Sequence, residues 1–409
     1  MDQNFDVIIS GAGPAGSTCA LFLAKAGKKV LLIEKEKFPR DKICADNKTW
    51  KCLDIIKELG LWSEFEKLPK KEINGVLVAS PAGNEFYTPL LKSDVKEKGP
   101  WFNVRRELFD NFLAKACTKN KNITLLENCE TKNPIIEDGN VIGLEFYNKK
   151  SKKIQKEFAK IVVGADGSNS PVANSLNLSP KLKGRYALNC RAYYKGVGGR
   201  ADACELYYLK GICPGYFWIF PVDNGMYNIG VGMRLEDIEA QNINLEGKME
   251  EMINSEKFKA RFAKAKRVTK FGTWGISVLP GKRKWSGSGF ILIGDAGTFA
   301  MTFSGEGVGP SMRSGKIAAK AINEAYEADD FSAKSLHRFD EKMWEILKPE
   351  TQGFRWLEFL ILNEVIFDWV AKKSGNNKDL IEISSRMQND YSAARELFTP
   401  KTFFKLLFG

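Results

Sequence analysis

A glycine-rich turn close to the N-terminus has the residue spacing of a dinucleotide-binding loop. Its sequence is Gly11-Ala12-Gly13-Pro14-Ala15-Gly16, and it lies between an apolar, β-rich run over residues 6–10 and apolar residues at helical spacing over 17–26. In such a turn the first glycine permits a tight bend, the second lets a pyrophosphate approach the backbone, and the third lets helix and strand pack closely. The helix N-terminus adds unpaired N–H groups and a positive dipole end. The turn therefore predicts a site for a nucleotide diphosphate.

Glu34 completes this signature at the end of a second β-rich run, residues 29–33. It lies 18 residues after Gly16, where an acidic side chain accepts hydrogen bonds from ribose hydroxyls. Strand, helix, second strand and acid in register predict a βαβ unit. They do not distinguish NAD from FAD.

Two later segments favour a single extended dinucleotide. Residues 159–167 and 289–297 are apolar, β-rich runs that end in polar, glycine-rich turns, which contain Asp166 and Asp295. Each aspartate thus lies at the carboxyl end of a buried strand, where open α/β sheets bind their ligands. A third turn, residues 304–309, leads into a helix whose N-terminus can stabilise negative charge on a reduced flavin ring. FAD explains all these turns together.

These motifs resemble the glutathione-reductase-like FAD fold of the aromatic hydroxylase group, and three further segments are similar to motifs of geranylgeranyl reductases. Residues 38–44 resemble the PxxKxC motif, residues 106–110 the RxxFD segment, and residues 214–221 (PGYFWIFP) the YxWxFP motif. The resemblance covers essentially the whole chain. It implies an α/β fold, in which a Rossmann-like FAD-binding domain of glutathione-reductase type carries an inserted antiparallel-sheet substrate domain and a helical C-terminal segment.

The domain boundaries follow from where the β-rich and helical patterns change along the chain. We expect the FAD-binding domain to comprise residues 1–75, 100–175 and 281–340. We expect the substrate domain to comprise residues 76–99 and 176–280, and the helical C-terminal segment to comprise residues 341–409.

The resemblance also implies which residues bind FAD. They are Gly11, Gly13, Pro14, Ala15, Gly16, Glu34, Lys35, Arg40, Cys44, Ala45, Arg106, Thr131, Asp166, Gly167, Gly294, Asp295, Gly305, Gly307, Val308 and Gly309. Cys44 and Ala45 are expected beside the isoalloxazine ring, and Thr131 is included because it follows a predicted strand. The chain departs from the family pattern at Ala45, where the family has glycine, and at Pro171, near which the family carries an arginine. These departures concern the substrate more than the cofactor.

The aromatic stretch within residues 214–221 admits two interpretations. Side chains alternate between the faces of a strand, so Tyr216, Trp218 and Phe220 share one face. The residues alone favour a strand packed on both faces, since aromatic residues belong to cores by default. The resemblance instead favours a tunnel wall beside the flavin. The expected substrate-binding residues are then Tyr216, Trp218, Phe220 and Pro221.

The resemblance implies a flavin-dependent reductase that hydrogenates isolated double bonds of a geranylgeranyl or other polyprenyl chain, carried by a lipid, a quinone or a diphosphate. Reduced FAD gives a hydride from N5 to one alkene carbon, and a proton reaches the other. Cys44 is expected to donate the proton or to position the reactants, and packing on the flavin as a small residue stays equally open. Tyr216 and Trp218 are expected to stabilise the developing cation with their ring faces. Asp46 is a second candidate acid.

Two alternatives stay open. One is an FAD-dependent monooxygenase or halogenase on the same fold, because halogenases carry a WxWxIP segment similar to this strand. Lys48 is the candidate for the lysine that halogenases need between flavin and substrate. The other alternative is a carrier of lipid or flavin without catalysis. The segment at residues 38–44 favours the reductase.

Composition limits the class of protein and its partners. The chain has 409 residues, of which 44% are hydrophobic and 27% charged, and this indicates a globular protein of two or three domains. The net charge of +12 comes mostly from scattered lysines without a nucleic-acid motif, so we expect a solubilising surface and no nucleic-acid partner. Eight cysteines without a CxxC pair, together with one histidine, argue against a metal site and predict reduced thiols.

The last expectations concern electrons and location. No second nicotinamide-binding unit is visible, so a ferredoxin or transiently bound NAD(P)H is expected as electron donor. The acidic N-terminus is not a signal peptide, and no stretch is apolar enough to span a bilayer, which predicts a cytoplasmic protein. Residues 354–370 are apolar with interspersed charges. Packing on the core is the favoured interpretation, and a tunnel cap or peripheral contact with the inner face of the cell membrane is the alternative.

Overall fold

A computed structural model describes residues 4–301, 305–375, 377–388, 390–399 and 402 of the chain. Its FAD-binding domain is built on a mainly parallel sheet with the strand order β19-β20-β12-β1-β2-β8. The bounds are β1 Val7–Ser10, β2 Val30–Glu34, β8 Ile123–Glu127, β12 Ile161–Gly164, β19 Ser286–Gly287 and β20 Phe290–Leu292. β1 pairs in parallel with both β2 and β12, so the turns that follow these strands lie at one edge of the sheet.

Close helix packing fixes the first turn. Helix α1 (Pro14–Lys25) begins at Pro14 rather than at residue 17, because proline suits the first turn of a helix. A Cβ on Gly16 would lie 1.9 Å from the carbonyl oxygen of Gly11, so only glycine allows this contact. Helix α10 (Val308–Glu327) packs along α1, and a Cβ on Gly315 would lie 2.4 Å from the carbonyl oxygen of Ala15.

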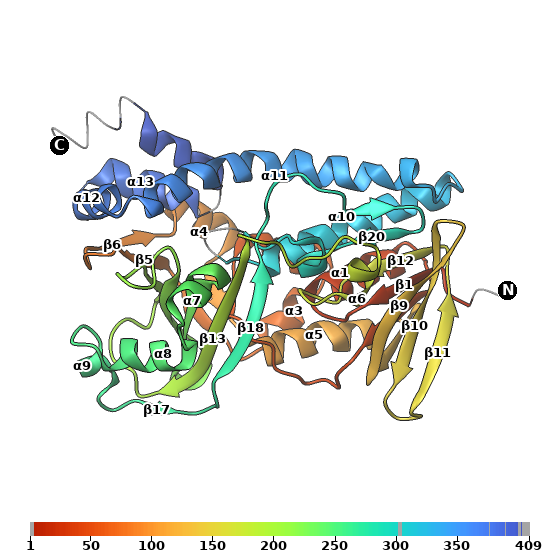
Figure 1. Cartoon of the computed structure of the whole chain (residues 1–409), viewed down its shortest axis with the longest axis horizontal. Coiled ribbons are helices and arrows are strands. Elements are labelled where there is room, and N and C mark those ends of the chain that lie inside the picture. Colours follow the sequence, from red (N-terminus) through yellow and green to blue (C-terminus); the bar gives the residue numbers. More distant parts are fainter. Residues whose placement is uncertain (1–3, 302–304, 376, 389, 400–401, 403–409) are drawn as a thin grey trace.

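Smaller elements flank this sheet. Strands β9 (Cys129–Glu137), β10 (Asn140–Asn148) and β11 (Lys153–Phe158) form an antiparallel sheet beside it, at the right in Figure 1. A short sheet of order β3-β7-β4 leads toward the second domain. The remaining bounds in this part are β3 Asn47–Lys48, β4 Lys71–Ile73, β7 Trp101–Asn103, α2 Trp50–Glu58, α3 Trp62–Glu66, α4 Lys92–Lys98, α5 Arg106–Thr118, α6 Pro171–Ser175 and η2 Gly294–Gly297.

The second sheet has the order β17-β13-β16-β15-β14-β5-β6, with β18 also paired to β13. The bounds are β5 Gly75–Ala79, β6 Glu85–Pro89, β13 Tyr186–Lys195, β14 Ala203–Tyr207, β15 Tyr216–Pro221, β16 Met226–Arg234, β17 Lys266–Arg267 and β18 Gly272–Ser277. Its strand pairs are antiparallel as expected, except that β5 and β14 pair in parallel. Through this pair the β5–β6 hairpin, from early in the chain, joins the edge of a sheet whose other strands come from much later in the chain. This pairing supports the proposal that residues 76–99 and 176–280 form one substrate domain.

One face of this sheet is a hydrophobic core. Phe217 and Ile219 of β15 pack there with side chains of α8 (Leu245–Asn254) and α9 (Lys259–Phe262). The short η1 (Asp223–Gly225) joins β15 to β16, and helix α7 (Leu235–Gln241) follows β16 directly. The opposite face carries Tyr216, Trp218 and Phe220 and points away from this core.

The C-terminal helices complete the described fold. Helix α11 (Ala333–Leu362) runs along the top of Figure 1, past α10 and toward α12 (Glu364–Ser374) and α13 (Lys378–Met387), and η3 (Tyr391–Phe398) follows. The helical segment thus begins earlier than residue 341, and residues 354–370 form two helices that meet at Asn363. The last part of the expected segment, residues 403–409, lies outside the described residues. Among the described residues, no helix is long and apolar enough to cross a bilayer.

Candidate active site

The two domains and the C-terminal helices enclose a cavity of about 1060 Å³. One end lies at the carboxyl ends of β1, β2 and β12. The other end lies between the aromatic face of the second sheet and helices α11 to α13. We call these two ends the flavin end and the apolar arm.

The flavin end collects nearly all the residues that the sequence assigned to FAD. Each of them lines the cavity except Gly16 and Gly309. Gly16 packs against Gly11, as described above. Gly309 faces away, and a Cβ there would lie 2.9 Å from the Cβ of Lys51. These two glycines therefore shape the turns that carry the lining residues.

A chain of alternating charges forms part of the flavin end. The Glu34 carboxylate accepts hydrogen bonds from the backbone N–H of Ala12 and from Arg40, each at 3.2 Å. Arg40 also donates to Asp110 at 2.9 Å, and Arg106 donates to both oxygens of Asp110 at 2.7 and 2.8 Å. Burial by itself raises the pKa of Asp110 most strongly, but the charges of Arg106 and Arg40 outweigh it and hold that pKa below its usual value. Burial alone would lower the pKa of Arg106, but the adjacent Asp110 raises it, so the Arg106 guanidinium stays charged at the cavity wall.

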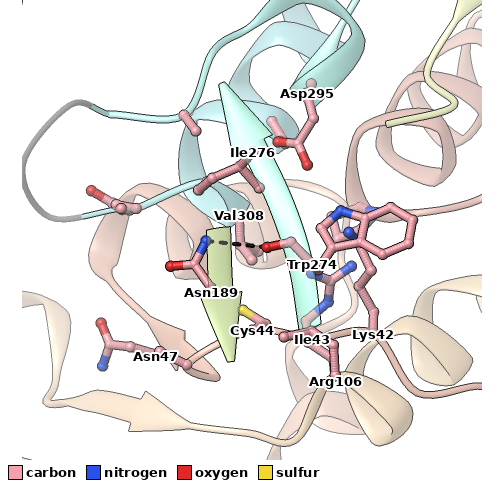
Figure 2. Close-up of a pocket in the computed structure, with 18 of the residues that line it drawn as sticks. Lys42, Ile43, Cys44, Asn47, Arg106, Asn189, Trp274, Ile276, Asp295 and Val308 are labelled. Atoms are coloured by element: carbon pink, nitrogen blue, oxygen red, sulfur yellow. Dashed lines mark hydrogen bonds between the residues drawn. The ribbon is translucent and has the colours of Figure 1, made fainter. Parts of the chain in front are cut away.

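Three buried polar atoms at this end lack a hydrogen-bond partner among the described residues: Nζ of Lys42, Nε1 of Trp274 and Oδ1 of Asp166. All three residues line the cavity, and Figure 2 shows Lys42 lying against the indole of Trp274, with Nζ 3.7 Å from the ring centroid. Burial lowers the pKa of Lys42 to about 7 and raises that of Asp166 to about 6. An unmatched buried polar group costs about 1–3 kcal/mol, so a ligand that offers both acceptors and donors is stabilised here.

The loop with Cys44 separates the flavin end from the apolar arm. Cys44 lines the cavity and is partly exposed, and its sulfur accepts a hydrogen bond from the backbone N–H of Asp46 at 3.4 Å. Asp46 is fully buried, with a positive φ of 73°, and its carboxylate accepts from the backbone N–H of Arg106 at 3.0 Å, from Tyr193 at 2.6 Å and from Asn228 at 2.7 Å. These three hydrogen bonds anchor the loop.

The aromatic face of β15 forms the first part of the apolar arm. Tyr216, Trp218 and Phe220 all line the cavity, and the rings of Tyr216 and Trp218 meet at 6.0 Å with an interplanar angle of 61°. Burial raises the pKa of Tyr216 above its usual value, so its hydroxyl stays neutral. Pro221 does not line the cavity, and its carbonyl accepts from Asn103 at 2.7 Å.

Beyond these rings the arm is mainly apolar. Its apolar walls come from the edge of the sheet and from the inner face of α11 and α12: Val76, Val78, Phe86, Leu206, Leu357, Leu360, Ile361, Phe367 and Val370. The polar side chains of Thr88, Ser374, Ser384 and Gln388 line it as well. The lysines and arginines among the described lining residues are Lys35, Arg40, Lys42, Arg106 and Lys132, and all belong to the FAD-binding domain. The cavity thus joins a charged end to an end without cationic side chains.

Comparison with known proteins agrees with this division. Residues 4–327 match the family model described as FAD binding domain. A digeranylgeranylglycerophospholipid reductase of Methanopyrus kandleri is 30% identical over 84% of this chain and 83% of its own. The chain belongs to the geranylgeranyl reductase family.

Solved structures show how widely this family's fold is shared. A geranylgeranyl bacteriochlorophyll reductase-like protein of Thermoplasma acidophilum has a TM-score of 0.83 at 21% identity, covering 97% of this chain and 99% of its own. A flavin-dependent brominase has a TM-score of 0.78 at 23% identity, covering 98% and 97%. The fold alone therefore does not separate reductases from halogenases.

Membership of the geranylgeranyl reductase family makes this chain an FAD-dependent oxidoreductase, and its flavin end fits that cofactor. FAD carries a diphosphate, ribose and ribityl hydroxyls and ring carbonyls, which match the unpartnered donors Lys42 and Trp274 and the acceptor Asp166. The Gly11–Gly16 turn and the helix that starts at Pro14 supply the backbone N–H groups for the diphosphate.

Lys48 weighs against the halogenase alternative. Its side chain is fully buried, and Nζ donates to the backbone carbonyls of Asp46 at 2.8 Å and Val104 at 3.0 Å. Lys48 does not line the cavity. The lysine that the sequence offered for a halogenase therefore has a structural role in the Cys44 loop.

Sequence reasoning missed several lining residues. Trp274 and Ile276 of β18 and Asn189 of β13 carry no motif, and they reach the cavity only through long-range packing (Figure 2). Leu357, Leu360 and Ile361 of α11 also line the cavity, as expected from the tunnel-cap alternative for residues 354–370. Lys42 is the lysine of the PxxKxC segment, and this position could have indicated that it lines the cavity.

Lys42 predicts a pH-dependent affinity for FAD. If Nζ donates to FAD, binding raises the pKa of Lys42 from about 7, so binding takes up a proton and the affinity falls as the pH rises above 7. The expected loss is about tenfold for each unit by which binding raises that pKa. The measurement is the dissociation constant of FAD with FAD-free protein across this pH range.

Two variants control this measurement. Lys42→Arg keeps a permanent charge and should bind FAD without the slope. Lys42→Met should bind more weakly at pH 6, also without the slope. A slope that persists in Lys42→Met would show that another group takes up the proton.

Proposed function

We propose that this chain hydrogenates isolated double bonds of a geranylgeranyl or other polyprenyl chain with electrons from FAD. The observation that carries the proposal is the cavity, which joins a flavin end to an apolar arm across Cys44 and the rings of Tyr216 and Trp218. An isoprenoid chain has no hydrogen-bonding groups, and most of the side chains that line this arm are apolar. The names of the curated relatives support a glycerophospholipid as the carrier of the chain.

When bound and reduced, FAD supplies the hydride that reaches one carbon of the double bond. The residues of the chain supply the rest of the reaction. The other carbon must receive a proton, and the Cys44 thiol is the proposed donor because it lies where the flavin end meets the apolar arm. Tyr216 and Trp218 present ring faces that can stabilise positive charge as it develops on the alkene. The arm around them excludes water, which would otherwise capture such a cation.

We propose an external electron donor, either a ferredoxin or transiently bound NAD(P)H. Reduction of the bound flavin by each donor in turn, followed by its absorbance, distinguishes the two.

We propose that the protein works in the cytoplasm, in contact with the membrane that holds its substrate. Helices α11 and α12 support this contact, because their inner face lines the apolar arm while their outer face exposes apolar residues. These are Trp356, Phe359, Leu362, Val365 and Ile366, with exposed fractions of 46, 49, 51, 83 and 37%. Such a patch at the wall of a lipid-sized cavity is typical of a surface that enters the interfacial region of a bilayer.

The activity is tested without oxygen. The flavin of the purified protein is reduced chemically, a geranylgeranyl glycerophospholipid is added in detergent, and flavin absorbance and lipid mass are followed together. We expect one double bond to disappear for each flavin reoxidised. A flavin that stays reduced until oxygen is admitted would favour the monooxygenase or halogenase instead.

The same assay tests Cys44. Cys44→Ser should keep its bound FAD but reoxidise it with the lipid about 100-fold to 10,000-fold more slowly, the range expected for loss of a general acid. Cys213→Ser is the matched control, since Cys213 is also partly exposed but does not line the cavity. Equal rates in the two variants would remove Cys44 from the mechanism.

The membrane face is tested by sedimentation with liposomes of phosphatidylcholine and phosphatidylglycerol. The double variant Phe359→Ser, Val365→Ser should bind at least about tenfold more weakly, because it removes apolar area that the bilayer would bury. The matched control is Ile136→Ser, Ile154→Ser, which removes exposed apolar side chains at 49 and 59% exposure from the sheet of β9 to β11. Equal binding by both variants would contradict the proposal, and loss of a dimer in Phe359→Ser, Val365→Ser would reassign the patch to contact between copies.

A further inference from the structure

The Asn228 side chain on β16 connects the two groups to which the proposed reaction assigns chemistry. It is fully buried, and Oδ1 accepts from the Trp218 indole N–H at 2.9 Å. Nδ2 donates to the backbone carbonyl of Cys44 at 2.6 Å and to the carboxylate of Asp46 at 2.7 Å. One amide thus binds the indole of the substrate sheet and the loop of the FAD-binding domain.

The indole is constrained on its flat side as well. Trp218 of β15 lies opposite Gly230 of β16, and a Cβ on Gly230 would lie 2.1 Å from Cζ2 of the indole. The ring therefore rests on the backbone of β16, and any larger residue than glycine at 230 would displace it. Asn228 thus fixes the edge of the indole through a hydrogen bond, and Gly230 lets the face of the indole lie close to the backbone of β16.

The Cys44 loop is held by the same face of the sheet. Arg191 of β13 donates to Asp41 at 2.9 Å and to the carbonyl of Lys42 at 3.2 Å, and Tyr193 donates to Asp46 at 2.6 Å. Among these three donors, Asn228 is the one that also contacts Trp218. It is therefore the direct link between the loop and the aromatic wall.

We propose that Asn228 is a positioning residue that fixes the Cys44 backbone relative to the Trp218 indole, so that proton donor and ring face meet the double bond in one arrangement. This inference rests on the proposed function for its chemical meaning. The amide itself touches neither cavity nor reactants, because Asn228 does not line the cavity. Its effect must therefore pass through Cys44 and Trp218.

The first measurement needs no turnover. In a Cys213→Ser background Cys44 is the remaining cysteine that is not buried, so the rate of alkylation by iodoacetamide reports on its loop. Asn228→Leu keeps the branched shape but removes the donors and the acceptor, and it should make Cys44 react several-fold faster because the loop is released. Gly230→Ala should displace Trp218 alone and leave this rate unchanged.

The second measurement is the anaerobic reoxidation of reduced flavin by the lipid. Both Asn228→Leu and Gly230→Ala should slow it by about 10-fold to 100-fold, the cost expected of a misplacement of about 1 Å, with a smaller change in the lipid concentration needed for half-saturation. Asn228→Ser should show the same changes to a smaller extent, and it serves if the leucine variant does not fold.

Tyr207→Phe is the control for lost stability. It removes a buried hydrogen bond to Glu205 on the other face of the same sheet, away from the cavity, and should lower the melting temperature without changing either rate. If Asn228→Leu behaves like Tyr207→Phe, with a lower melting temperature and unchanged rates, the positioning role is refuted. If the parent protein does not reduce the lipid at all, the proposed function fails, while the alkylation rates still decide whether Asn228 holds Cys44.

Discussion

The site depends on the attachment of residues 41–46, a loop of the FAD-binding domain, to the face of the substrate sheet. Arg191, Tyr193 and Asn228 make this attachment through short hydrogen bonds. Asp41, the partner of Arg191, is exposed, whereas Asp46 is buried together with its donors Tyr193 and Asn228. In buried surroundings a hydrogen bond to a charged group is stronger than at the surface, and loss of the bonds to Asp46 leaves a buried charge unmatched. The two domains therefore cannot shift at this point without breaking several such bonds at once. This gives the cavity a fixed boundary between its two ends.

The distribution of charge follows from that boundary. On one side, the side chains of Glu34, Arg40, Asp110 and Arg106 form a row of ion pairs. Each arginine therefore has a carboxylate partner in a place where a lone guanidinium would be costly. On the other side, the described walls of the arm have no cation, and burial keeps Tyr216 neutral. The two ends of one cavity thus differ in charge as an anionic dinucleotide and a neutral hydrocarbon do, and in the proposed function the two molecules meet at Cys44.

Local patterns predicted the parts of the fold that local physics determines. The glycine turn, its helix and Glu34 are specified by backbone sterics within one βαβ unit, and the alternation of residues 216–220 specifies which side chains face the cavity. What the patterns could not predict depends on partners far away in the chain. Lys48 was a candidate for the halogenase lysine, and its bonds to the carbonyls of Asp46 and Val104, the latter 56 residues away, give it a structural role instead. Trp274, Asn228 and the parallel pairing of β5 with β14 likewise depend on segments more than a hundred residues apart.

The same reasoning explains how one fold can serve reductases and a brominase. The backbone similarity to the brominase is high, so the difference in chemistry must come from side chains and from what encloses them. In this chain Lys48 is withdrawn into the loop, a thiol stands at the junction, and α11 closes the arm with Leu357, Leu360 and Ile361 on its inner face. The outer face of the same helix is apolar and exposed at Trp356 and Phe359. The inner face of this helix lines the arm, and the membrane contact proposed above would cover its exposed apolar residues, which are otherwise unfavourable in water.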